Sequence, residues 1–337
     1  MLRRTTLQIP IIAALAMASL TATAPAQAEP EVLHVPGEVH FAMTAHGAEV
    51  LHTVRRGDGN WYPFNFVPNA PVGHSPHTVA SAIVGSEEHV MTYYSHGIGP
   101  QTSTWYVIRR ASGSWATQVS PPGGGTTATF ALAGVAGELH RVGWDRTGDG
   151  SLQHALRRSD GTWSSLSTVP VQSTYGDEFA IAGSGGALHV LVNNIPLGGA
   201  FSSFVRYADG GWERLPDVPF TPPTGTRAVT VVMTQVGTEL HAVVTGGDGR
   251  LYHAARRSNG AWTAFHDVAS QTGDPGSVVR QATITAASGA LHLAIATDDQ
   301  RLLHTIRFGD GSWLPYGDVE QATGWQGDPG RISIAGS

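Results

Sequence analysis

Residues Leu302–Trp313 read LLHTIRFGDGSW, and the chain repeats the pattern of this phrase six times. In each copy an Arg lies six residues before a Trp, and a Gly lies two residues before that Trp. Successive Trp residues are 54, 48, 49, 50 and 51 positions apart. A fixed period of about fifty residues indicates a repeat architecture. The repeated residues are Arg55 and Trp61, Arg109 and Trp115, Arg157 and Trp163, Arg206 and Trp212, Arg256 and Trp262, and Arg307 and Trp313.

One copy contains four short segments that read as β-strands. Residues 281–286, 290–296 and 302–307 alternate between apolar and polar side chains, and a fourth segment, 312–316, follows the Asp310-Gly311 pair. Asp-Gly is a preferred hairpin turn, and short alternating strands between regular turns are typical of all-β proteins. Four antiparallel strands per fifty residues are typical of a propeller blade. The sequence therefore predicts an all-β fold, a six-bladed β-propeller of four-stranded antiparallel blades.

The two ends of the chain complement each other. The first copy has strand patterns at 39–43 and 50–55 and a fourth strand from Trp61, but no first strand beyond a short segment at 32–34. The last segment, 331–335, resembles a first strand without followers. We therefore expect the C-terminal strand to complete the N-terminal blade, which closes the ring and removes exposed strand edges. Seven blades remain the alternative if residues 66–80 contain a further copy.

The N-terminus has the pattern of a signal peptide. Arg3 and Arg4 form a basic region, residues 9–20 are apolar, and Ala26-Gln27-Ala28 is a small-x-small cleavage site. We expect residues 1–28 to be removed near Ala28, residues 29–337 to form one propeller domain, and the mature protein to be secreted. General secretion is favoured over the twin-arginine route.

Composition narrows the class of partner. The net charge of −6 gives no basic field, so nucleic acid is not expected as a partner. The chain has no Cys, so the ring must be held by its own core and by its closure. No later segment reads as a membrane span.

A two-residue hairpin loop predicts which residues face each other. It would place Trp313 opposite Phe308, with Arg or Tyr in the same place in the other copies. Because side chains alternate along a strand, each repeated Arg would then point away from its own Trp and toward the Trp of the next blade. Two interpretations stay open: the Arg and Trp form a sugar pocket between blades, or the Arg bonds a carboxylate or carbonyl there and joins the blades.

Ten of the 16 His residues recur in register. Zinc needs three or four ligands that converge on one point, whereas a six-fold set is spread around a ring. We therefore expect no metal and no cofactor, and His residues that hydrogen-bond neighbouring strands. The recurring residues are His40, His89, His140, His189, His241 and His292 on the second strand, and His52, His154, His253 and His304 on the third.

The sequence contains no HExxH, GxSxG or P-loop motif and no Cys nucleophile, which favours a protein that is not an enzyme. An enzyme remains possible if unlike residues meet at one mouth of the central channel. Single-copy acids are the candidates for such a cluster: Glu87, Glu88, Glu138, Asp177 and Glu178.

The phrases at 251–262 and 303–313 resemble the repeats of secreted bacterial propeller lectins that bind fucose, and more loosely those of six-bladed fungal fucose lectins. The resemblance extends over residues 31–337. It implies sugar sites between adjacent blades, held by Arg, an acid and aromatic residues without metal. The repeated Arg and Trp residues match this description. The acids at the end of the fourth strand, Asp217, Asp267 and Asp318, occur in only three copies.

Carbohydrate or glycoconjugate binding is therefore the leading function, with the twelve repeated Arg and Trp residues as the ligand-binding candidates and no catalytic residue. One alternative is a protein-interaction scaffold with a surface patch of irregular aromatics. These are Tyr93, Tyr94, Trp105, Trp144 and Trp325. A second alternative is a hydrolase or lyase with a site in the central channel.

Overall fold

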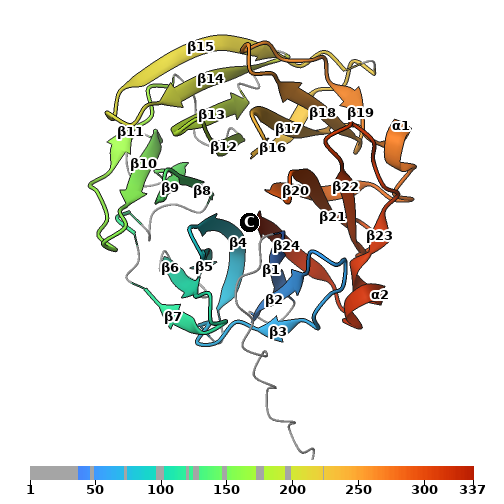
Figure 1. Ribbon diagram of the computed structural model, residues 1–337, viewed down its shortest axis with the longest axis horizontal. Coiled ribbons are helices and arrows are strands. Elements are labelled where there is room, and N and C mark those ends of the chain that lie inside the picture. The colour runs from blue at the N-terminus through green and yellow to red at the C-terminus, as the bar shows by residue number, and fades with distance from the viewer. Residues whose placement is uncertain are drawn as a thin grey trace, which may run out of the picture.

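The computed structural model describes residues 37–45, 49–71, 74–95, 102–118, 121–123, 129–145, 150–171, 178–193, 199–222 and 224–337. The predicted signal peptide lies outside these ranges. Six four-stranded antiparallel sheets stand around a central axis (Figure 1). The prediction of a six-bladed all-β propeller is confirmed. The seven-blade alternative is wrong because residues 75–84 form the innermost strand of the second blade.

The blades are numbered in chain order, and their strands are given from the axis outward. Blade 1 consists of β24 (Pro329–Gly336), β1 (Val39–Ala45), β2 (Glu49–Arg55) and β3 (Asn65–Phe66). Blade 2 consists of β4 (Ser75–Val84), β5 (Glu87–Ser95), β6 (Thr102–Arg109) and β7 (Trp115–Thr117). Blade 3 consists of β8 (Phe130–Val135), β9 (Glu138–Trp144), β10 (Leu152–Arg157) and β11 (Ser167–Thr168).

The other three blades repeat this order. Blade 4 consists of β12 (Phe179–Ser184), β13 (Ala187–Asn193), β14 (Ala200–Arg206) and β15 (Trp212–Pro219). Blade 5 consists of β16 (Ala228–Val236), β17 (Glu239–Gly246), β18 (Leu251–Arg256) and β19 (His266–Asp267). Blade 6 consists of β20 (Val279–Ala287), β21 (Ala290–Thr297), β22 (Leu302–Arg307) and β23 (Gly317–Asp318).

The C-terminal strand closes the ring. β24 pairs antiparallel with β1, with Gly336 opposite Val39 and Ile334 opposite Phe41. Figure 1 shows β24 near the axis beside β1, with the C-terminus close to the centre of the ring. The predicted closure is confirmed, and β24 covers the inner edge of β1, which would otherwise be unpaired.

The core is divided among the six interfaces between adjacent blades. Each interface contains one cluster of buried apolar side chains. For example, Phe201 of blade 4 packs with Val231 and Tyr252 of blade 5. Both faces of every blade are therefore buried, which explains why inner strands such as β21 carry apolar side chains on both faces.

Glycine allows the inner strands to approach closely. A Cβ at Gly183 would fall far inside van der Waals contact with the carbonyl oxygen of Gly134 in blade 3, and a Cβ at Gly134 would meet the carbonyl oxygen of Ile83 in the same way. Backbone takes the space that a side chain would need, so these positions accept only Gly.

Two short helices follow the outer strands of blades 5 and 6: α1 (Ala269–Thr272) and α2 (Val319–Thr323). The Asp318 carboxylate accepts a hydrogen bond from the Gln321 N–H and caps α2, and Gly324 ends it with a φ of 73°. In the part of the chain that the structure describes, no helix has the length and apolar character needed to cross a membrane.

Candidate functional site

The hairpin between the third and fourth strands has a three-residue loop instead of the predicted two-residue loop. In blade 6, the Phe308 N–H donates to the carbonyl oxygen of Ser312 at 2.9 Å, so that Arg307 pairs directly with Trp313. The prediction that each repeated Arg points away from its own Trp is therefore wrong. The other pairs are Arg55 with Trp61, Arg109 with Trp115, Arg157 with Trp163, Arg206 with Trp212, and Arg256 with Trp262.

The repeated Gly explains the longer loop. In blade 6 the Gly311 N–H donates to the carbonyl oxygen of Phe308 at 3.0 Å, and Gly311 has a φ of 92°. A turn followed by a residue in the left-handed region is the usual three-residue hairpin, and it requires Gly at its third position. The loop is one residue longer than predicted, so the pairing of the two strands shifts by one residue. A shift of one residue places the Arg on the same face as its Trp instead of the opposite face.

Each Trp contacts the blade that precedes its own. The indole ring lies edge-on to a ring on the third strand of that blade, with interplanar angles between 69° and 85°. Trp262 instead packs against the apolar cluster between blades 4 and 5. Because the Arg lies directly across from the Trp, both line the cleft between a blade and its predecessor. The ring pairs are Trp61 with His304, Trp115 with His52, Trp163 with Tyr106, Trp212 with His154, and Trp313 with His253.

The recurring His residues form pairs within a blade. The Nδ1 of His140 is 3.0 Å from the Nε2 of His154, and the corresponding distance between His241 and His253 is 2.9 Å. In blade 2, His89 instead bonds the Tyr106 hydroxyl at 2.6 Å. The expectation that these His residues hydrogen-bond a neighbouring strand is confirmed for these pairs.

Burial keeps the paired His residues neutral at pH 7. It is the main reason that the pKa is lowered to about 4 for His140 and His241 and to about 3 for His154 and His253. The repeated Arg of the next blade lowers these values further, as Arg206 does for His140 and Arg307 for His241.

Five of the six repeated guanidinium groups are half-buried but make no ion pair with a carboxylate of the described residues: Arg55, Arg157, Arg206, Arg256 and Arg307. Arg157 donates to the Gln118 side-chain oxygen of blade 2 at 3.4 Å, and Arg307 donates to the carbonyl oxygen of Phe308 at 3.5 Å. These are long hydrogen bonds, so the guanidinium groups keep strong donor capacity toward the cleft.

An acid faces the same clefts from the second strand. Glu239 lies two residues before His241, and its Oε2 is 3.8 Å from the Nε2 of His241. Side chains two residues apart share a strand face, so Glu239 points toward the cleft that holds Arg307. Glu87 occupies the same place in blade 2. Burial is the main cause of the raised pKa of Tyr106, but Glu87 raises this pKa further and Arg157 lowers it. Both charged groups therefore lie near the Tyr106 ring, in the cleft between blades 2 and 3.

The same pattern places a Glu in four clefts together with an Arg and a Trp, but Glu38, between blades 1 and 2, is buried at 2% exposed. In the other three clefts the acid is half-buried. The sets are Glu87, Arg157 and Trp163 between blades 2 and 3; Glu138, Arg206 and Trp212 between blades 3 and 4; and Glu239, Arg307 and Trp313 between blades 5 and 6. The acids at the end of the fourth strand lie elsewhere: Asp217 bonds Arg214, Asp267 bonds Arg250, and Asp318 caps α2.

The cleft between blades 1 and 2 is different because it contains Glu88. This carboxylate is 1% exposed, and its Oε2 lies 3.0 Å from the Nδ1 of His40 and 2.9 Å from the Nε2 of His52. Burial alone would raise the pKa of Glu88, but His52 and His40 outweigh it and hold this pKa well below its usual value. The sequence contains one indication that Glu88 is special: it is the only Glu at a position where the other copies have an apolar residue. These residues are Val39, Leu139, Leu188, Leu240 and Leu291.

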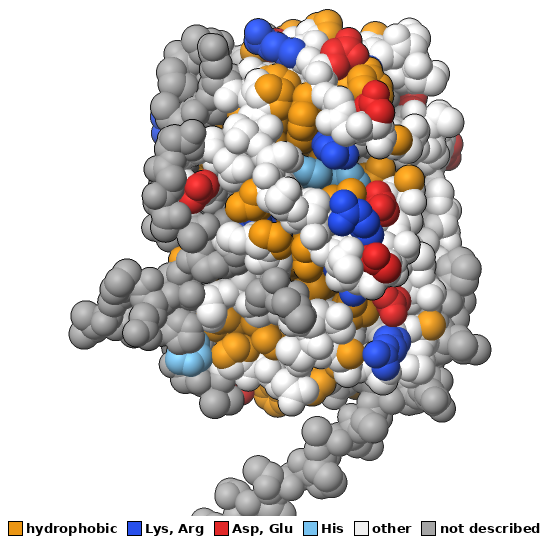
Figure 2. Space-filling view, turned by 90° about the vertical axis from the view of Figure 1, so that its left-hand side faces the viewer, with side chains coloured by type: hydrophobic (Ala, Val, Ile, Leu, Met, Phe, Trp, Pro, Cys, Tyr) orange, Lys and Arg blue, Asp and Glu red, His pale blue; other side chains and the backbone are white. Residues whose placement is uncertain are grey.

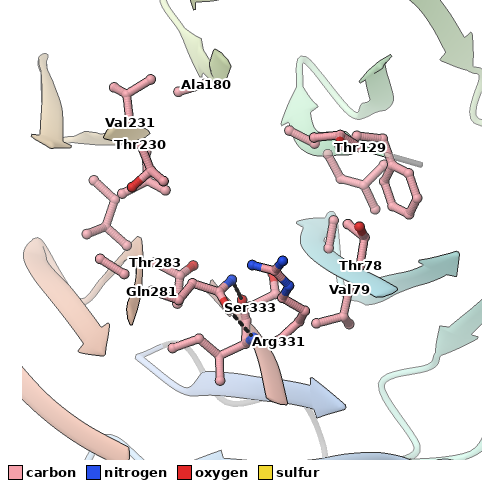
Figure 3. A pocket seen from close by; sticks show the side chains of 18 of the residues that line it. Thr78, Val79, Thr129, Ala180, Thr230, Val231, Gln281, Thr283, Arg331 and Ser333 are labelled. Atoms are coloured by element: carbon pink, nitrogen blue, oxygen red, sulfur yellow. Dashed lines mark hydrogen bonds between the residues drawn. The ribbon is translucent and has the colours of Figure 1, made fainter. Parts of the chain in front are cut away.

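The inner strands enclose a cavity of about 260 Å³ at one mouth of the channel. Figure 3 shows Thr78, Thr129, Thr230, Gln281 and Arg331 around it. Glu178 also lines this cavity, and burial raises its pKa while Arg331 lowers it. Of the single-copy acids, only Glu178 lines this cavity among the residues that the structure describes; Asp177 lies outside those residues.

The predicted aromatic interaction patch is not on the surface. Tyr93, Tyr94, Trp105 and Trp144 are buried in the interfaces between blades, and Trp325 packs against Phe64. On the flank that Figure 2 shows, hydrophobic side chains form small groups between Arg and acidic side chains. The observation that favoured a protein-interaction scaffold is therefore lost.

No protein-family model matches this chain, and no curated protein matches its sequence. Several solved structures share its fold. A mutant of the Aleuria aurantia lectin in complex with Fucα1-6GlcNAc has a TM-score of 0.60 and 11% identity, with 86% of this chain and 96% of that chain covered. AofleA from Arthrobotrys oligospora has a TM-score of 0.54 and 15% identity, with 91% of each chain covered. The BP39L lectin from Burkholderia pseudomallei has a TM-score of 0.56 and 16% identity, with 85% of this chain and 82% of that chain covered. At these identities the likeness shows a common propeller fold.

Proposed function

We propose that this protein is a lectin-like propeller that binds carbohydrate in the clefts between adjacent blades. The observation that carries the proposal is the direct pairing of each repeated Arg with its Trp, which turns a ring and a hydrogen-bond donor toward the same cleft. A sugar presents a C–H face that stacks on an aromatic ring and hydroxyl groups that accept from guanidinium. Structural neighbours described as lectins, one of them in complex with Fucα1-6GlcNAc, support this function.

The complete sites are the three clefts in which the acid is half-buried and a ligand can reach it. In the cleft between blades 5 and 6, Trp313 is the stacking surface, Arg307 the donor, and Glu239 the acceptor for sugar hydroxyl protons. The Glu239 side chain is 42% exposed, so a ligand can reach it. A hydrogen bond between a sugar hydroxyl and a charged group contributes about 1.5–3 kcal/mol, so losing one such partner weakens binding by about 10-fold or more.

The test is a glycan array on residues 29–337, followed by calorimetric titration with the best monosaccharide. A variant with Arg157, Arg206 and Arg307 all changed to Ala should fold and lose binding. In the matched control, three exposed Arg residues that directly follow a repeated Arg are changed to Ala: Arg110, Arg158 and Arg257. This control should bind as many sugar molecules per chain as the wild type. A blank array from folded wild-type protein, or equal loss in both variants, would contradict the proposal.

We also propose that the protein is secreted after cleavage near Ala28. The basic Arg3 and Arg4, the apolar residues 9–20 and the Ala26-Gln27-Ala28 site support this. N-terminal sequencing of the protein from culture medium should start near Glu29. A chain that stays inside the cell with Met1 intact would contradict export.

A further inference from the structure

The cluster between blades 1 and 2 contains three metal-ligating atoms that converge on one point. They are the Nδ1 of His40, the Nε2 of His52 and the Oε2 of Glu88, and all three side chains are 2% exposed or less. Two come from adjacent strands of blade 1 and one from the second strand of blade 2. From this geometry we propose that His40, His52 and Glu88 form a binding site for a zinc ion.

The distances fit a tetrahedral ion. Zinc holds nitrogen and oxygen ligands at about 2.0–2.1 Å, which places neighbouring ligand atoms about 3.3 Å apart. The three atoms here are separated by 3.4 Å, 3.0 Å and 2.9 Å. An ion about 2 Å from all three atoms lies roughly 1 Å out of their plane, which leaves the fourth position for water.

The His pair of blade 1 differs from the other His pairs in its spacing and in having an acid as a third neighbour. The same two nitrogen atoms are 3.0 Å, 2.9 Å and 3.1 Å apart in blades 3, 5 and 6, where they share one hydrogen bond. In blade 1 they are 3.4 Å apart, and both face Glu88. The next blade supplies Leu188, Leu291 and Val39 at the place of Glu88 in those three clefts, so these pairs lack a third ligand.

The charges around the cluster favour a cation. Glu38 is 2% exposed, and its Oε2 is 3.8 Å from the Nε2 of His40, on the far side of the ring from Glu88. In zinc sites a carboxylate usually accepts a hydrogen bond from the second ring nitrogen of a ligating His. Glu38 lies on that side of His40, although 3.8 Å is too long for a hydrogen bond. Arg109 lies directly across from Glu88 in the register of β5 and β6, and it adds one positive charge. Two carboxylates against one guanidinium leave a net negative charge that a bound cation offsets.

The site is independent of the proposed sugar sites, because it uses none of their Arg, Trp or acid residues. It also explains why this cleft departs from the others: the acid here is turned inward on His residues. The two proposals can therefore be tested separately: the protein can bind zinc without binding carbohydrate, or carbohydrate without zinc.

The experiment starts from full-length mature protein that is unfolded, freed of metal with a chelator, and refolded with Zn²⁺ or Co²⁺, because the buried site is best loaded during folding. Wild-type protein should retain one zinc ion per chain after dialysis. With Co²⁺ it should show the strong visible absorption of a tetrahedral complex. His52→Gln should abolish both signals, and Glu88→Gln should weaken affinity by more than the roughly 10- to 100-fold that loss of an outer partner costs.

The matched control is His154→Gln, which removes the corresponding His from a pair without a third ligand and should leave one zinc ion per chain. Circular dichroism establishes that each variant is folded. If the two ligand variants do not fold, the wild-type Co²⁺ spectrum decides alone. Folded wild-type protein with no retained zinc and no tetrahedral Co²⁺ absorption would overturn the proposal. Zinc that is lost equally in His154→Gln would do the same.

Discussion

Lowering the pH from 7 to 5 should destabilise this propeller through its buried His pairs. Folded His253 has a pKa of about 3 and folded His241 a pKa of about 4, mainly because of burial, whereas an unfolded His has a pKa of about 6.5. Because the folded pKa lies below the unfolded one, the unfolded chain takes up protons first as the pH falls. The unfolding free energy is therefore undiminished above pH 6.5 and decreases as the pH falls toward the folded pKa values.

The size of the loss follows from proton uptake by the unfolded chain. Below pH 6.5 each His that stays neutral in the folded state costs about 1.4 kcal/mol per pH unit, which gives about 2 kcal/mol at pH 5. The pair of His241 and His253 therefore accounts for about 4 kcal/mol of unfolding free energy. Such a loss is a large part of the stability of an ordinary domain.

Urea denaturation of wild type and His253→Tyr at pH 8, 7 and 5 measures this loss. Tyr is the residue that blade 2 carries at this position, where Tyr106 bonds His89. The variant has one His fewer, so its loss between pH 7 and pH 5 should be smaller by about 2 kcal/mol, with no difference between pH 8 and pH 7. An equal loss in both proteins, or an NMR titration that places the pKa of His253 near 6.5, would show that burial of the His pairs does not cause the acid sensitivity.

Three further changes test the fold. Gly161→Ala should cost about 1–2 kcal/mol in urea denaturation, since this turn residue has a φ of 87° and its Cβ would lie 3.2 Å from the Nη2 of Arg157. Gly183→Ala should cost more than that and lower the melting temperature further than Gly185→Ala, because a Cβ at Gly183 meets the backbone of blade 3 while one at Gly185 meets open space; equal melting temperatures would count against close packing of the inner strands. Truncation before Pro329 removes β24 and exposes the inner edge of β1, so gel filtration should show oligomers or aggregates in place of the wild-type species.

Much of the fold can be predicted from the sequence. The period of the Arg, Gly and Trp residues predicts the number of blades, and the lone strand at 331–335 predicts the closure, because both are written in local patterns that recur. The sequence also placed the repeated Trp residues at the clefts between blades, but it placed each Arg beside the Trp of the wrong blade.

The candidate sites depended on details that a local pattern does not contain. One residue in the hairpin loop decides which face of the strand each Arg occupies. The three-residue loop that ends in Gly311 places Arg307 beside Trp313, whereas a two-residue loop would place it on the other face. The acids of the sugar sites come from the second strand, where a Glu precedes the recurring His by two residues in four copies. Only the folded ring shows that this position faces the Arg of the next blade.

The repeating unit, the number of blades and the closure of the ring follow from the amino-acid sequence alone, since strand alternation and turn chemistry act over a few neighbouring residues. The contacts across blades required the folded ring. The ring buried Tyr94 and Trp144, and it brought Glu88 to within 3.0 Å of His40, which lies 48 positions earlier in the chain. Packing between neighbouring blades fixes these contacts, and packing between residues so far apart in the chain follows no local period.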